Sequence, residues 1–285
     1  MQKKMQKVQT LLEALPFIQE FSNQIVVIKY GGSAQVKEEL KAKFAQDILL
    51  LNLVGLKPVI VHGGGKSITT LLDALCVKSE FKNGLRVTNR ESMRVAEMVL
   101  SGEINSQIVQ LLNFYGAKAI GMSGKDAGSI KAKAINMEEL GYTGQITSID
   151  SQVLHNIIND GFIPVIAPIA CGNEAGHPGF NINADFMASK VAVALGAKKV
   201  VFLTDTPGVL NSEKELLDTL SEPEIRALKE DGTIAGGMIP KVDSCLEAVH
   251  GGVNKAHIID GRIEHSILLE LFTDEGIGTQ ISANA

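Results

Sequence analysis

Short apolar runs alternate along the chain with longer segments in which apolar residues recur every three or four positions. The short runs are rich in valine and isoleucine and are apolar almost throughout, which indicates strands buried on both faces, as in a parallel sheet. The longer segments have the period of amphipathic helices. The pattern predicts strands at residues 24–30, 58–62, 117–121, 162–168, 199–205 and 255–260, and helices at residues 38–53, 68–75, 90–100, 153–159, 185–195 and 242–249.

Strands that alternate with helices form βα units, so the predicted fold class is α/β, with helices that cover a mainly parallel sheet. In open sheets of this kind, ligands bind beyond the carboxyl ends of the strands. Glycine-rich turns follow the first two predicted strands. We therefore expect the functional site at that edge of the sheet.

Two segments depart from the alternation. Residues 125–145 mix glycine, polar residues and short β-prone pieces, which predicts hairpins folded over one edge of the site. Near the N-terminus, apolar residues recur at helical spacing on both sides of Pro16, and an interior proline removes one helix hydrogen bond. Residues 1–22 are therefore predicted to form a kinked amphipathic helix, with an apolar stripe of Met5, Val8, Leu11, Leu12, Leu15, Ile18 and Phe21.

Composition excludes several classes of protein. The chain has 285 residues, of which 45% are hydrophobic, enough for one large domain or two lobes. A net charge of −5 argues against non-specific nucleic-acid binding, which uses clustered lysine and arginine. No apolar stretch reaches the roughly 18 residues of a membrane span, and polar residues interrupt the N-terminal apolar ones, unlike a secretory signal. We expect a cytoplasmic protein without nucleic-acid or membrane partners.

Cysteine and histidine spacing gives no metal motif. Cys76, Cys171 and Cys245 lie far apart without a CxxC spacing, which predicts buried, reduced thiols rather than disulfides or zinc ligands. The six histidines show no HxxxH spacing. We therefore expect no metal held by protein side chains.

The sequence KPVIVHGGGKS at residues 57–67 ends an apolar run in three glycines followed by Lys66 and Ser67, as many phosphate-binding loops begin. A P-loop needs another glycine where Ile60 stands, inside the predicted strand. The dinucleotide pattern GxGxxG also fails, because Ser67 and Ile68 follow where further glycines are required. A strand, three glycines and a helix remain, and their backbone N–H groups make a small anion site suited to a flat carboxylate. Lys66 and Ser67 would then merely begin the helix; the alternative is a tight turn without a ligand.

A second glycine turn, at residues 29–34, follows the first predicted strand. Lys29 lies at the end of that strand, before Gly31 and Gly32, and lysines are seldom buried without a partner. A cation beside a glycine turn is a natural place for a phosphoryl group. The alternative is a lysine that extends to solvent from the strand edge.

Further charged residues are expected at the same edge. Arg86 lies in a predicted glycine-containing loop, and its guanidinium suits bidentate binding of a carboxylate, although a lone arginine is more often solvated. Asn181, Asn183 and Asp185 occupy alternate positions of an extended segment that leads into a helix, which Asp185 could simply cap. A flexible loop, GGMIPK, ends in Lys241, for which a surface position is the alternative.

Taken together, these motifs resemble the amino-acid-kinase family. The matching segments run in the family's order over residues 24–281: IKYGGSA, VHGGGKSI, KNGLRVT, NINADFMA, LTDTPGVL and GGMIPK. Each is weak alone, but six in order make chance improbable. The segment NGLRVT after VHGGG resembles the branch that acts on N-acetyl-L-glutamate more than the aspartate, glutamate, carbamate or uridylate kinases. The resemblance implies a three-layer αβα sandwich around a mainly parallel central sheet, in two lobes.

The resemblance also implies an activity, namely transfer of the γ-phosphoryl group of ATP, with Mg²⁺ carried mainly by the phosphates, to the γ-carboxylate of N-acetyl-L-glutamate in arginine biosynthesis. A carboxylate is already ionised at pH 7, so no general base is needed. Another acceptor, such as glutamate or carbamate, is the nearest alternative. An NAD(P) oxidoreductase is disfavoured because neither turn completes the dinucleotide pattern. A catalytically silent arginine sensor is disfavoured because Lys29, Asp185 and Lys241 are all present.

Roles follow from the resemblance residue by residue. Lys29 and Lys241 would neutralise the transferring phosphoryl group from the acceptor and nucleotide sides, and Asp185 would hold both ammonium groups. Gly32 and Gly64 would donate backbone N–H bonds to the moving group. The expected acceptor contacts are Gly64, Gly65, Arg86 and Asn181, and the expected phosphoryl and ATP contacts are Gly31, Gly32, Thr204, Asp205, Gly208, Gly237 and Met238.

The two ends of the chain resemble those of arginine-inhibited members. In such members an extra kinked helix joins dimers into a hexamer, which is a trimer of dimers. The helix at residues 1–22 matches this description. The alternative is a docking helix that serves packing alone. The implied organisation is this helix, an acceptor lobe at residues 23–195 and a nucleotide lobe at residues 196–285. Whether a PII signalling protein is a further partner stays open. The candidate residues for an L-arginine site are Lys199, His257, Glu275 and Gly276.

Overall fold

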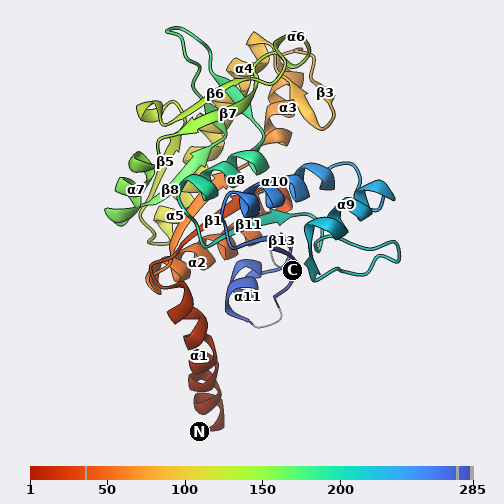
Figure 1. Cartoon of the computed structure of the whole chain (residues 1–285). Helices are drawn as coiled ribbons and strands as arrows, with labels where there is room; N and C mark the ends of the chain where they lie inside the picture. Colours follow the sequence, from red (N-terminus) through yellow and green to blue (C-terminus); the bar gives the residue numbers. More distant parts are fainter. Residues whose placement is uncertain (36, 274–275, 283–285) are drawn as a thin grey trace.

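The computed structural model describes residues 1–35, 37–273 and 276–282 (Figure 1). Its α-helices are α1 (Gln2–Phe21), α2 (Glu38–Leu53), α3 (Gly65–Ala74), α4 (Arg90–Glu97), α5 (Asn105–Phe114), α6 (Met137–Leu140), α7 (Ser151–Asn159), α8 (Ala184–Ala194), α9 (Glu222–Glu230), α10 (Met238–His250) and α11 (Ser266–Phe272). Two 3₁₀ turns, η1 (Gly32–Gln35) and η3 (Asp126–Gly128), and a π-helical segment, η2 (Met98–Ile104), complete the helical elements of these residues.

The strands are β1 (Ile25–Tyr30), β2 (Lys57–His62), β3 (Glu80–Lys82), β4 (Leu85–Val87), β5 (Ala119–Ser123), β6 (Ile130–Ala134), β7 (Thr143–Ile149), β8 (Ile163–Ala167), β9 (Ile169–Ala170), β10 (Phe180–Ile182), β11 (Lys199–Thr204), β12 (Thr219–Leu220), β13 (Lys255–Asp260) and β14 (Thr279–Ser282). The six strands and six helices predicted from the sequence all occur, with boundaries that differ by a few residues. The sequence pattern did not identify α5, α9, α11 or the β3–β4 hairpin.

Within the described residues, the central sheet has eight strands in the order β12-β14-β13-β11-β1-β2-β8-β5. Neighbours from β13 to β5 pair in parallel. At the other edge β14 pairs antiparallel with β13, and β12 pairs parallel with β14. The predicted mainly parallel sheet is therefore confirmed.

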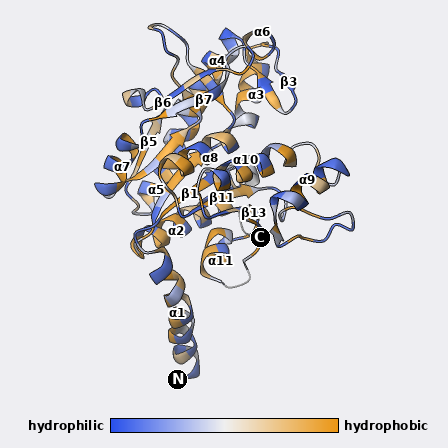
Figure 2. Ribbon diagram, viewed as in Figure 1, coloured by the Kyte–Doolittle hydropathy of each residue, from blue (hydrophilic) through white to orange (hydrophobic). Residues whose placement is uncertain are grey.

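Side chains on the two faces of β1 enter different hydrophobic cores. Val27 lies in a core that also contains residues of α7, α8 and α10, whereas Val26 and Ile28 lie in a second core with residues of α2, α5 and α11. Burial on both faces explains why the strand is apolar almost throughout. Helices on both sides of the sheet give the three-layer αβα arrangement expected from the sequence (Figures 1 and 2).

A smaller sheet accounts for the segment that departed from the alternation. Residues 125–145 form β6 and the start of β7, which pair antiparallel with the short helix α6 between them. The prediction of several hairpins in this segment is therefore wrong, because it supplies one hairpin. That hairpin extends into a four-stranded sheet in which β10 pairs parallel with β7 and antiparallel with β9.

Helix α1 projects away from the body of the fold (Figure 1). It forms as one helix that includes Pro16, and its last residue, Phe21, is buried in the core beside α2 and α11. Its apolar stripe is largely open to solvent, with Leu11 70% and Leu12 56% exposed. None of the helices in the described ranges is long and apolar enough to cross a membrane.

The three cysteines have different surroundings. Cys245 is buried, Cys171 is partly buried and Cys76 is exposed. The prediction of buried thiols is therefore correct for Cys245 and wrong for Cys76. Cys76 follows the end of α3 with a positive φ of 57°, a turn conformation that places its side chain at the surface.

The carboxyl ends of two neighbouring strands place the two glycine turns side by side. Strands β1 and β2 pair in parallel register, with Tyr30 opposite His62 as the last partners. Gly31 and Gly32 follow β1, and Gly63 and Gly64 follow β2 before α3 begins at Gly65. The sheet topology therefore brings together two turns that are separate in the sequence, as expected for ligand sites in open α/β sheets.

Candidate functional site

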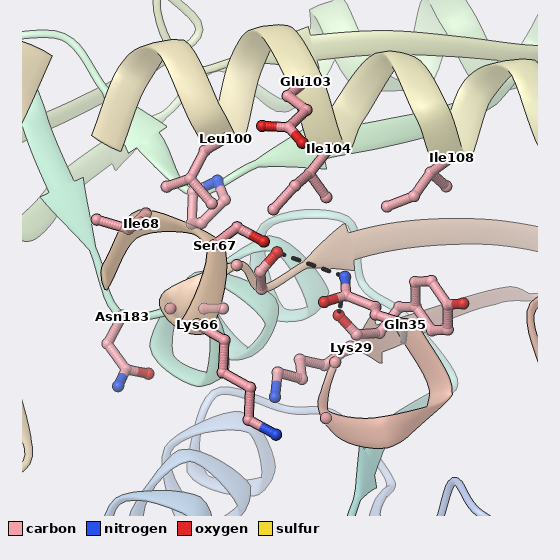
Figure 3. A pocket seen from close by; sticks show the side chains of 18 of the residues that line it. Lys29, Gln35, Lys66, Ser67, Ile68, Leu100, Glu103, Ile104, Ile108 and Asn183 are labelled. Atoms are coloured by element: carbon pink, nitrogen blue, oxygen red, sulfur yellow. Dashed lines mark hydrogen bonds between the residues drawn. The ribbon is translucent and has the colours of Figure 1, made fainter. Parts of the chain in front are cut away.

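A cavity of about 820 Å³ opens at the carboxyl ends of β1 and β2 (Figure 3). Both glycine turns, the first turn of α3 and one side of η2 and α5 line it. Strand β10 and the start of α8 form another part of its wall. The cavity therefore occupies the edge of the sheet at which the sequence predicted a site.

The first turn brings a buried lysine next to glycine. Lys29, the fifth residue of β1, is 8% exposed, so the alternative of a lysine extending to solvent is wrong. A Cβ atom at Gly31 would lie 2.8 Å from Lys29 Nζ, and at Gly32, where φ is +66°, a Cβ atom would overlap the carboxylate of Asp205. Glycine therefore lets the Lys29 ammonium group approach the backbone at Gly31 and the Asp205 carboxylate approach it at Gly32.

The second turn forms the N-terminus of α3. Gly64 is the residue before the helix, and a Cβ atom there would overlap Leu100 and Ile104 of η2. Lys66 and Ser67 begin the helix as expected, but both also line the cavity, and Figure 3 shows the side chain of Lys66 reaching into it. The expectation that these two residues only start a helix was therefore incomplete.

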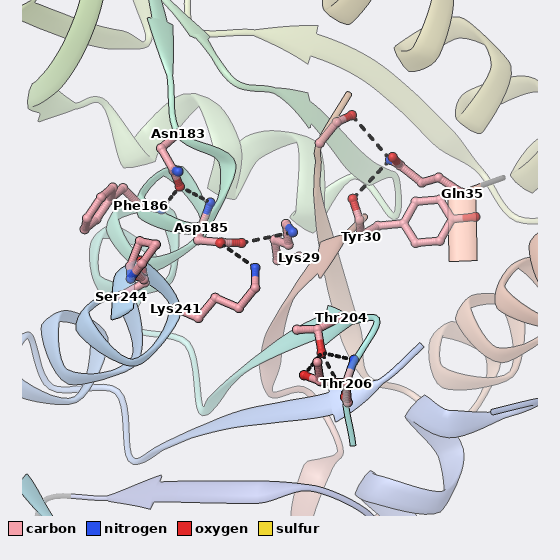
Figure 4. A network of polar contacts seen from close by, with 12 residues as sticks. Lys29, Tyr30, Gln35, Asn183, Asp185, Phe186, Thr204, Thr206, Lys241 and Ser244 are labelled. Carbon is pink, nitrogen blue, oxygen red and sulfur yellow. Dashed lines mark hydrogen bonds and ion pairs between the residues drawn. The ribbon is translucent and has the colours of Figure 1, made fainter. Parts of the chain in front are cut away.

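Asp185 links the two lysines that the sequence singled out (Figure 4). Its Oδ1 lies 3.0 Å from Lys29 Nζ, and its Oδ2 accepts a 2.9 Å hydrogen bond from Lys241 Nζ. Burial raises the pKa of the Asp185 carboxyl, but the two ammonium groups outweigh that effect and lower the pKa to about 2. A carboxylate that stays ionised thus holds two cations at the end of the cavity.

The alternative that Asp185 merely caps α8 is wrong. Asn183 is the residue before the helix, and its side-chain oxygen accepts hydrogen bonds from the backbone N–H groups of Asp185 and Phe186. The asparagine satisfies the exposed N–H groups of the first turn. The Asp185 carboxylate is therefore available to the lysines.

Arg86 lies on β4, and not in a loop as the sequence suggested, because the turn at Asn83 and Gly84 is the tip of the β3–β4 hairpin. It is 6% exposed and lines the cavity, so the alternative of a solvated arginine is wrong. Its Nη2 donates to the Gly65 carbonyl at 2.8 Å and to Thr69 Oγ1 at 2.9 Å. Burial lowers the pKa of the guanidinium. The arginine thus connects the hairpin to the start of α3.

Asn181 lies on β10 in the cavity wall, near Arg86. Its Nδ2 donates to Thr88 Oγ1 at 3.2 Å, and the hydroxyls of Thr88 and Thr143 are 2.8 Å apart. Sequence reasoning missed both threonines, although Thr88 belongs to the NGLRVT motif. Three elements distant in the sequence therefore form one polar wall.

His62, the last residue of β2, was also missed. It is fully buried, and burial lowers the pKa of its imidazole to about 4, so the ring is neutral at pH 7. Because Nδ1 lies 2.9 Å from the Gly63 carbonyl, which can only accept, Nδ1 carries the proton. Nε2 then accepts from Asn105 Nδ2 at 3.1 Å. This pair ties the second glycine turn to α5.

The residues expected to contact nucleotide lie on the other side of Lys29 and Asp185. Thr204 ends β11, next to β1, and Asp205 borders Gly32. Gly237 precedes α10, whose first turn contains Met238 and Lys241. Gly208 lies beside Thr279 of β14. The described lining of the 820 Å³ cavity includes none of these five residues.

The candidate effector residues come together around a carboxylate that the sequence did not single out. Glu270 of α11 is paired with His257 Nδ1, and a Cβ atom at Gly276 would lie 2.9 Å from Glu270 Oε2. Burial raises the pKa of the Glu270 carboxyl, but His257, the Ile277 N–H group and the charge of Lys199 together outweigh it and lower that pKa. Lys199 Nζ lies 4.7 Å from the centroid of the Phe21 ring, at the end of α1. Glu275, the carboxylate predicted for this site, lies outside the described residues.

In residues 1–35, 37–273 and 276–282, no three His, Cys, Asp or Glu side chains are grouped so that they could hold a metal ion. The site is instead made of cations, backbone amides and one buried carboxylate.

Residues 24–260 match the amino acid kinase family. The chain belongs to this family. The membership implied by the six motifs is thereby confirmed. The match covers both glycine turns, Arg86, Asp185 and Lys241, and it ends at the carboxyl end of β13.

Relatives of this amino acid kinase cover nearly its whole length. It is 66% identical to an acetylglutamate kinase of Sulfurimonas denitrificans, over 99% of this chain and 100% of the relative. An acetylglutamate kinase of Aliarcobacter butzleri is 65% identical, over 96% of this chain and 91% of the relative.

A solved structure resembles the whole chain. It is the N-acetylglutamate synthase of Neisseria gonorrhoeae in complex with coenzyme A and N-acetyl-glutamate, with a TM-score of 0.87 and 28% identity over 98% of this chain. The chain spans 64% of that synthase, less than two thirds of its length. Another structure of the same synthase contains coenzyme A and L-arginine.

Proposed function

We propose that this amino acid kinase transfers the γ-phosphoryl group of ATP to the side-chain carboxylate of N-acetyl-L-glutamate, the second step of arginine biosynthesis. The observation that carries the proposal is the shared contact of Lys29 and Lys241 with Asp185, beside the first glycine turn. Relatives with 66% and 65% identity that are named acetylglutamate kinase support the choice of acceptor. Residues 23–195 would form the acceptor lobe, and residues 196–285 the nucleotide lobe.

The acceptor would bind at the N-terminus of α3. Gly64 and Gly65 lie at the N-terminus of α3, where the helix dipole favours an anion, so their N–H groups would receive the reacting carboxylate. Arg86 would bind the α-carboxylate, with Asn181 beside it. Both line the same cavity as the glycines, and Arg86 is already fixed by its bonds to Gly65 and Thr69.

The transferring group would lie between Lys29 and Lys241, and Gly31 and Gly32 would contribute N–H groups. An ionised acceptor must approach a triphosphate, so charge neutralisation and positioning supply the catalysis, and no proton has to be removed. Asp185 would hold both ammonium groups in place. ATP would be bound by Thr204, Asp205, Gly208, Gly237 and Met238, with Mg²⁺ held mainly by its phosphates.

We further propose that L-arginine inhibits the enzyme by binding where α1 meets α11. Lys199, His257, Glu270 and Gly276 surround this place, and a buried carboxylate there suits a guanidinium. The structurally similar synthase has a complex with L-arginine. The exposed apolar stripe of α1 suits association of dimers into a hexamer, a trimer of dimers.

A coupled assay of ADP release tests the proposed reaction. Turnover with N-acetyl-L-glutamate should exceed turnover with L-glutamate or carbamate by orders of magnitude at equal concentration. A preference for glutamate or carbamate would assign the chain to another activity of the family. Detection of N-acetyl-L-glutamyl 5-phosphate as hydroxamate would establish the carboxylate as the acceptor.

A further inference from the structure

One side-chain amide contacts the last residue of β1 and the first residue after β2. Gln35 is the last residue of η1, immediately after the first turn. Its Nε2 lies 3.0 Å from the carbonyl oxygen of Tyr30 and 3.4 Å from that of Gly63, and both carbonyls accept from it (Figures 3 and 4). These carbonyls stand at the ends of β1 and β2.

Each of these carbonyls shares a peptide plane with a glycine N–H. In a trans peptide, C=O and N–H point in opposite directions, and the described residues contain no cis peptide. The Tyr30 carbonyl therefore sets the direction of the Gly31 N–H, and the Gly63 carbonyl that of the Gly64 N–H. Holding both oxygens toward Gln35 turns both N–H groups away from it.

The two N–H groups are available to a ligand. Gly31 and Gly64 both line the cavity, and no protein group in the described part of the chain accepts a hydrogen bond from either N–H. Buried or partly buried amides without a partner are costly, so a bound anion would stabilise them.

Other donors keep the two carbonyls paired when Gln35 is removed. The Tyr30 carbonyl also accepts from the Gly63 N–H at 2.9 Å, and the Gly63 carbonyl also accepts from His62 Nδ1 at 2.9 Å. Loss of Gln35 would therefore leave no buried carbonyl unpaired. It would remove the amide group that contacts both the Tyr30–Gly31 and the Gly63–Gly64 peptide groups.

We propose that Gln35 is a positioning residue, whose amide fixes the relative orientation of the Gly31 and Gly64 N–H groups. The inference rests on the proposed function, in which these two N–H groups face the transferring phosphoryl group and the attacking carboxylate. Hydrogen-bond donors that already point toward the charge that develops in the transition state lower the activation barrier more than they strengthen binding of the substrates. Gln35 would thus affect kcat more than either KM.

Two substitutions test this role. In Gln35→Leu, kcat should fall roughly tenfold or more while each KM stays within about twofold, because only the orientation of the donors is lost. In Gln35→Glu, an ionised carboxylate cannot donate to the two carbonyl oxygens and repels them, so kcat should fall further at about pH 8. The ratio of its kcat to that of wild type should rise toward about pH 5.5, as the carboxyl group regains a proton.

Gln152→Glu is the matched control, because Gln152 is exposed on α7 and hydrogen-bonds Asn156 four residues on. Its pH profile should be that of wild type. Wild-type kcat in Gln35→Leu, or a Gln35→Glu profile parallel to that of Gln152→Glu, would overturn the proposal. If Gln35→Leu does not fold, the pH dependence of the kcat ratio between Gln35→Glu and wild type tests the proposal alone. This ratio compares the same protein preparations at several pH values.

A second readout does not require turnover. In spectra of protein labelled with nitrogen-15 in glycine, the amide resonances of Gly31 and Gly64 should shift in Gln35→Leu, while that of Gly176, a surface turn glycine, should not. Unshifted Gly31 and Gly64 resonances would contradict the proposal. If the wild-type protein were inactive on N-acetyl-L-glutamate, the proposed function would be refuted. The amide resonances would then still test the role of Gln35.

Discussion

The carboxylate of Asp185 lies 2.9 Å from the ammonium group of Lys241, although 56 positions separate the two residues. Each stands in the first turn of a different helix, α8 or α10, and these helices contribute side chains to the same core on one face of the sheet. The ion pair is nearly closed to solvent on the Asp185 side. It therefore fixes one cation at the meeting point of the two proposed substrate sites.

Substitution of either lysine that contacts Asp185 should abolish most of the turnover. Lys29→Ala or Lys241→Ala removes one of the two cations proposed to neutralise the transferring group, so we expect kcat to fall roughly 100-fold or more. Steady-state kinetics of ADP release provide the measurement. Lys190→Ala is the control, because it breaks another α8–α10 ion pair, with Glu247 at 2.7 Å, outside the cavity lining. Near-wild-type kcat in either site variant would refute the mechanism.

Arg86→Ala should raise the KM for the acceptor. A charge-assisted hydrogen bond contributes about 1.5–3 kcal/mol, so we expect an increase of roughly 10- to 100-fold, with a smaller effect on the KM for ATP. Arg86→Lys should not restore binding, because an ammonium group cannot reproduce the planar contacts to Gly65 and Thr69. Arg226→Ala, which removes an exposed pair with Glu222, is the control. An unchanged acceptor KM would mean that Arg86 does not bind the acceptor.

His62 should make the fold sensitive to mild acid. Its folded-state pKa of about 4 lies below the ordinary 6.5, so between these values the unfolded chain binds a proton that the folded chain does not. The free energy of unfolding should therefore fall as the pH decreases from about 6.5 to 4, by up to about 3 kcal/mol from this residue. Urea unfolding at several pH values measures the slope.

The variant His62→Asn keeps a donor near the Gly63 carbonyl but does not titrate. It should be less stable than wild type at pH 7, since Asn105 loses an acceptor, and its stability should change less between about pH 6.5 and 4. His155→Asn on α7 is the control, because it removes a partly exposed histidine by the same substitution. Equal slopes for wild type and His62→Asn would show that His62 is not the cause.

Removal of residues 1–20 should reduce the assembly to dimers and weaken inhibition by L-arginine. The apolar stripe of α1 is exposed in the single chain, and its burial between dimers would stabilise the larger assembly. Light scattering after gel filtration measures the mass. Leu11→Glu should have the same effect, whereas Gln9→Glu, which adds the same charge beside the stripe, should not. An unchanged mass in the truncated protein would exclude α1 as the link between dimers.

Periodicity in the sequence was sufficient to predict the layers of the fold. Strands buried on both faces leave continuous apolar runs, and β13 has the same limits as its predicted strand. Helix α5 was missed because a π-helical segment joins it to α4, so the apolar period shifts between Met98 and Ile104. Arg86 was placed in a loop because a hairpin of two three-residue strands is too short to show alternation.

Site residues that act through their own motif could be found from the sequence, whereas those defined by tertiary contacts could not. Lys29 stood out as a charge at the end of an apolar strand. Gln35 looks like any polar residue after a turn, and its importance arises only when β1 and β2 are adjacent. Glu270 follows two leucines in a segment for which no helix was predicted, and its pairing with His257 depends on how α11 packs over β13.

The pairing of β1 with β2 has a consequence for how the family changes its substrates. Adjacent strands in a sheet are about 4.8 Å apart, and this spacing is fixed by backbone hydrogen bonds rather than by side chains. The separation of the two glycine turns is therefore insensitive to most mutations. The β3–β4 hairpin and β10, which carry Arg86 and Asn181, are free to vary in length and charge without altering that separation. If the turns and the hairpin have the roles proposed above, one scaffold would take acceptors of different size while the distance over which the phosphoryl group travels stays constant.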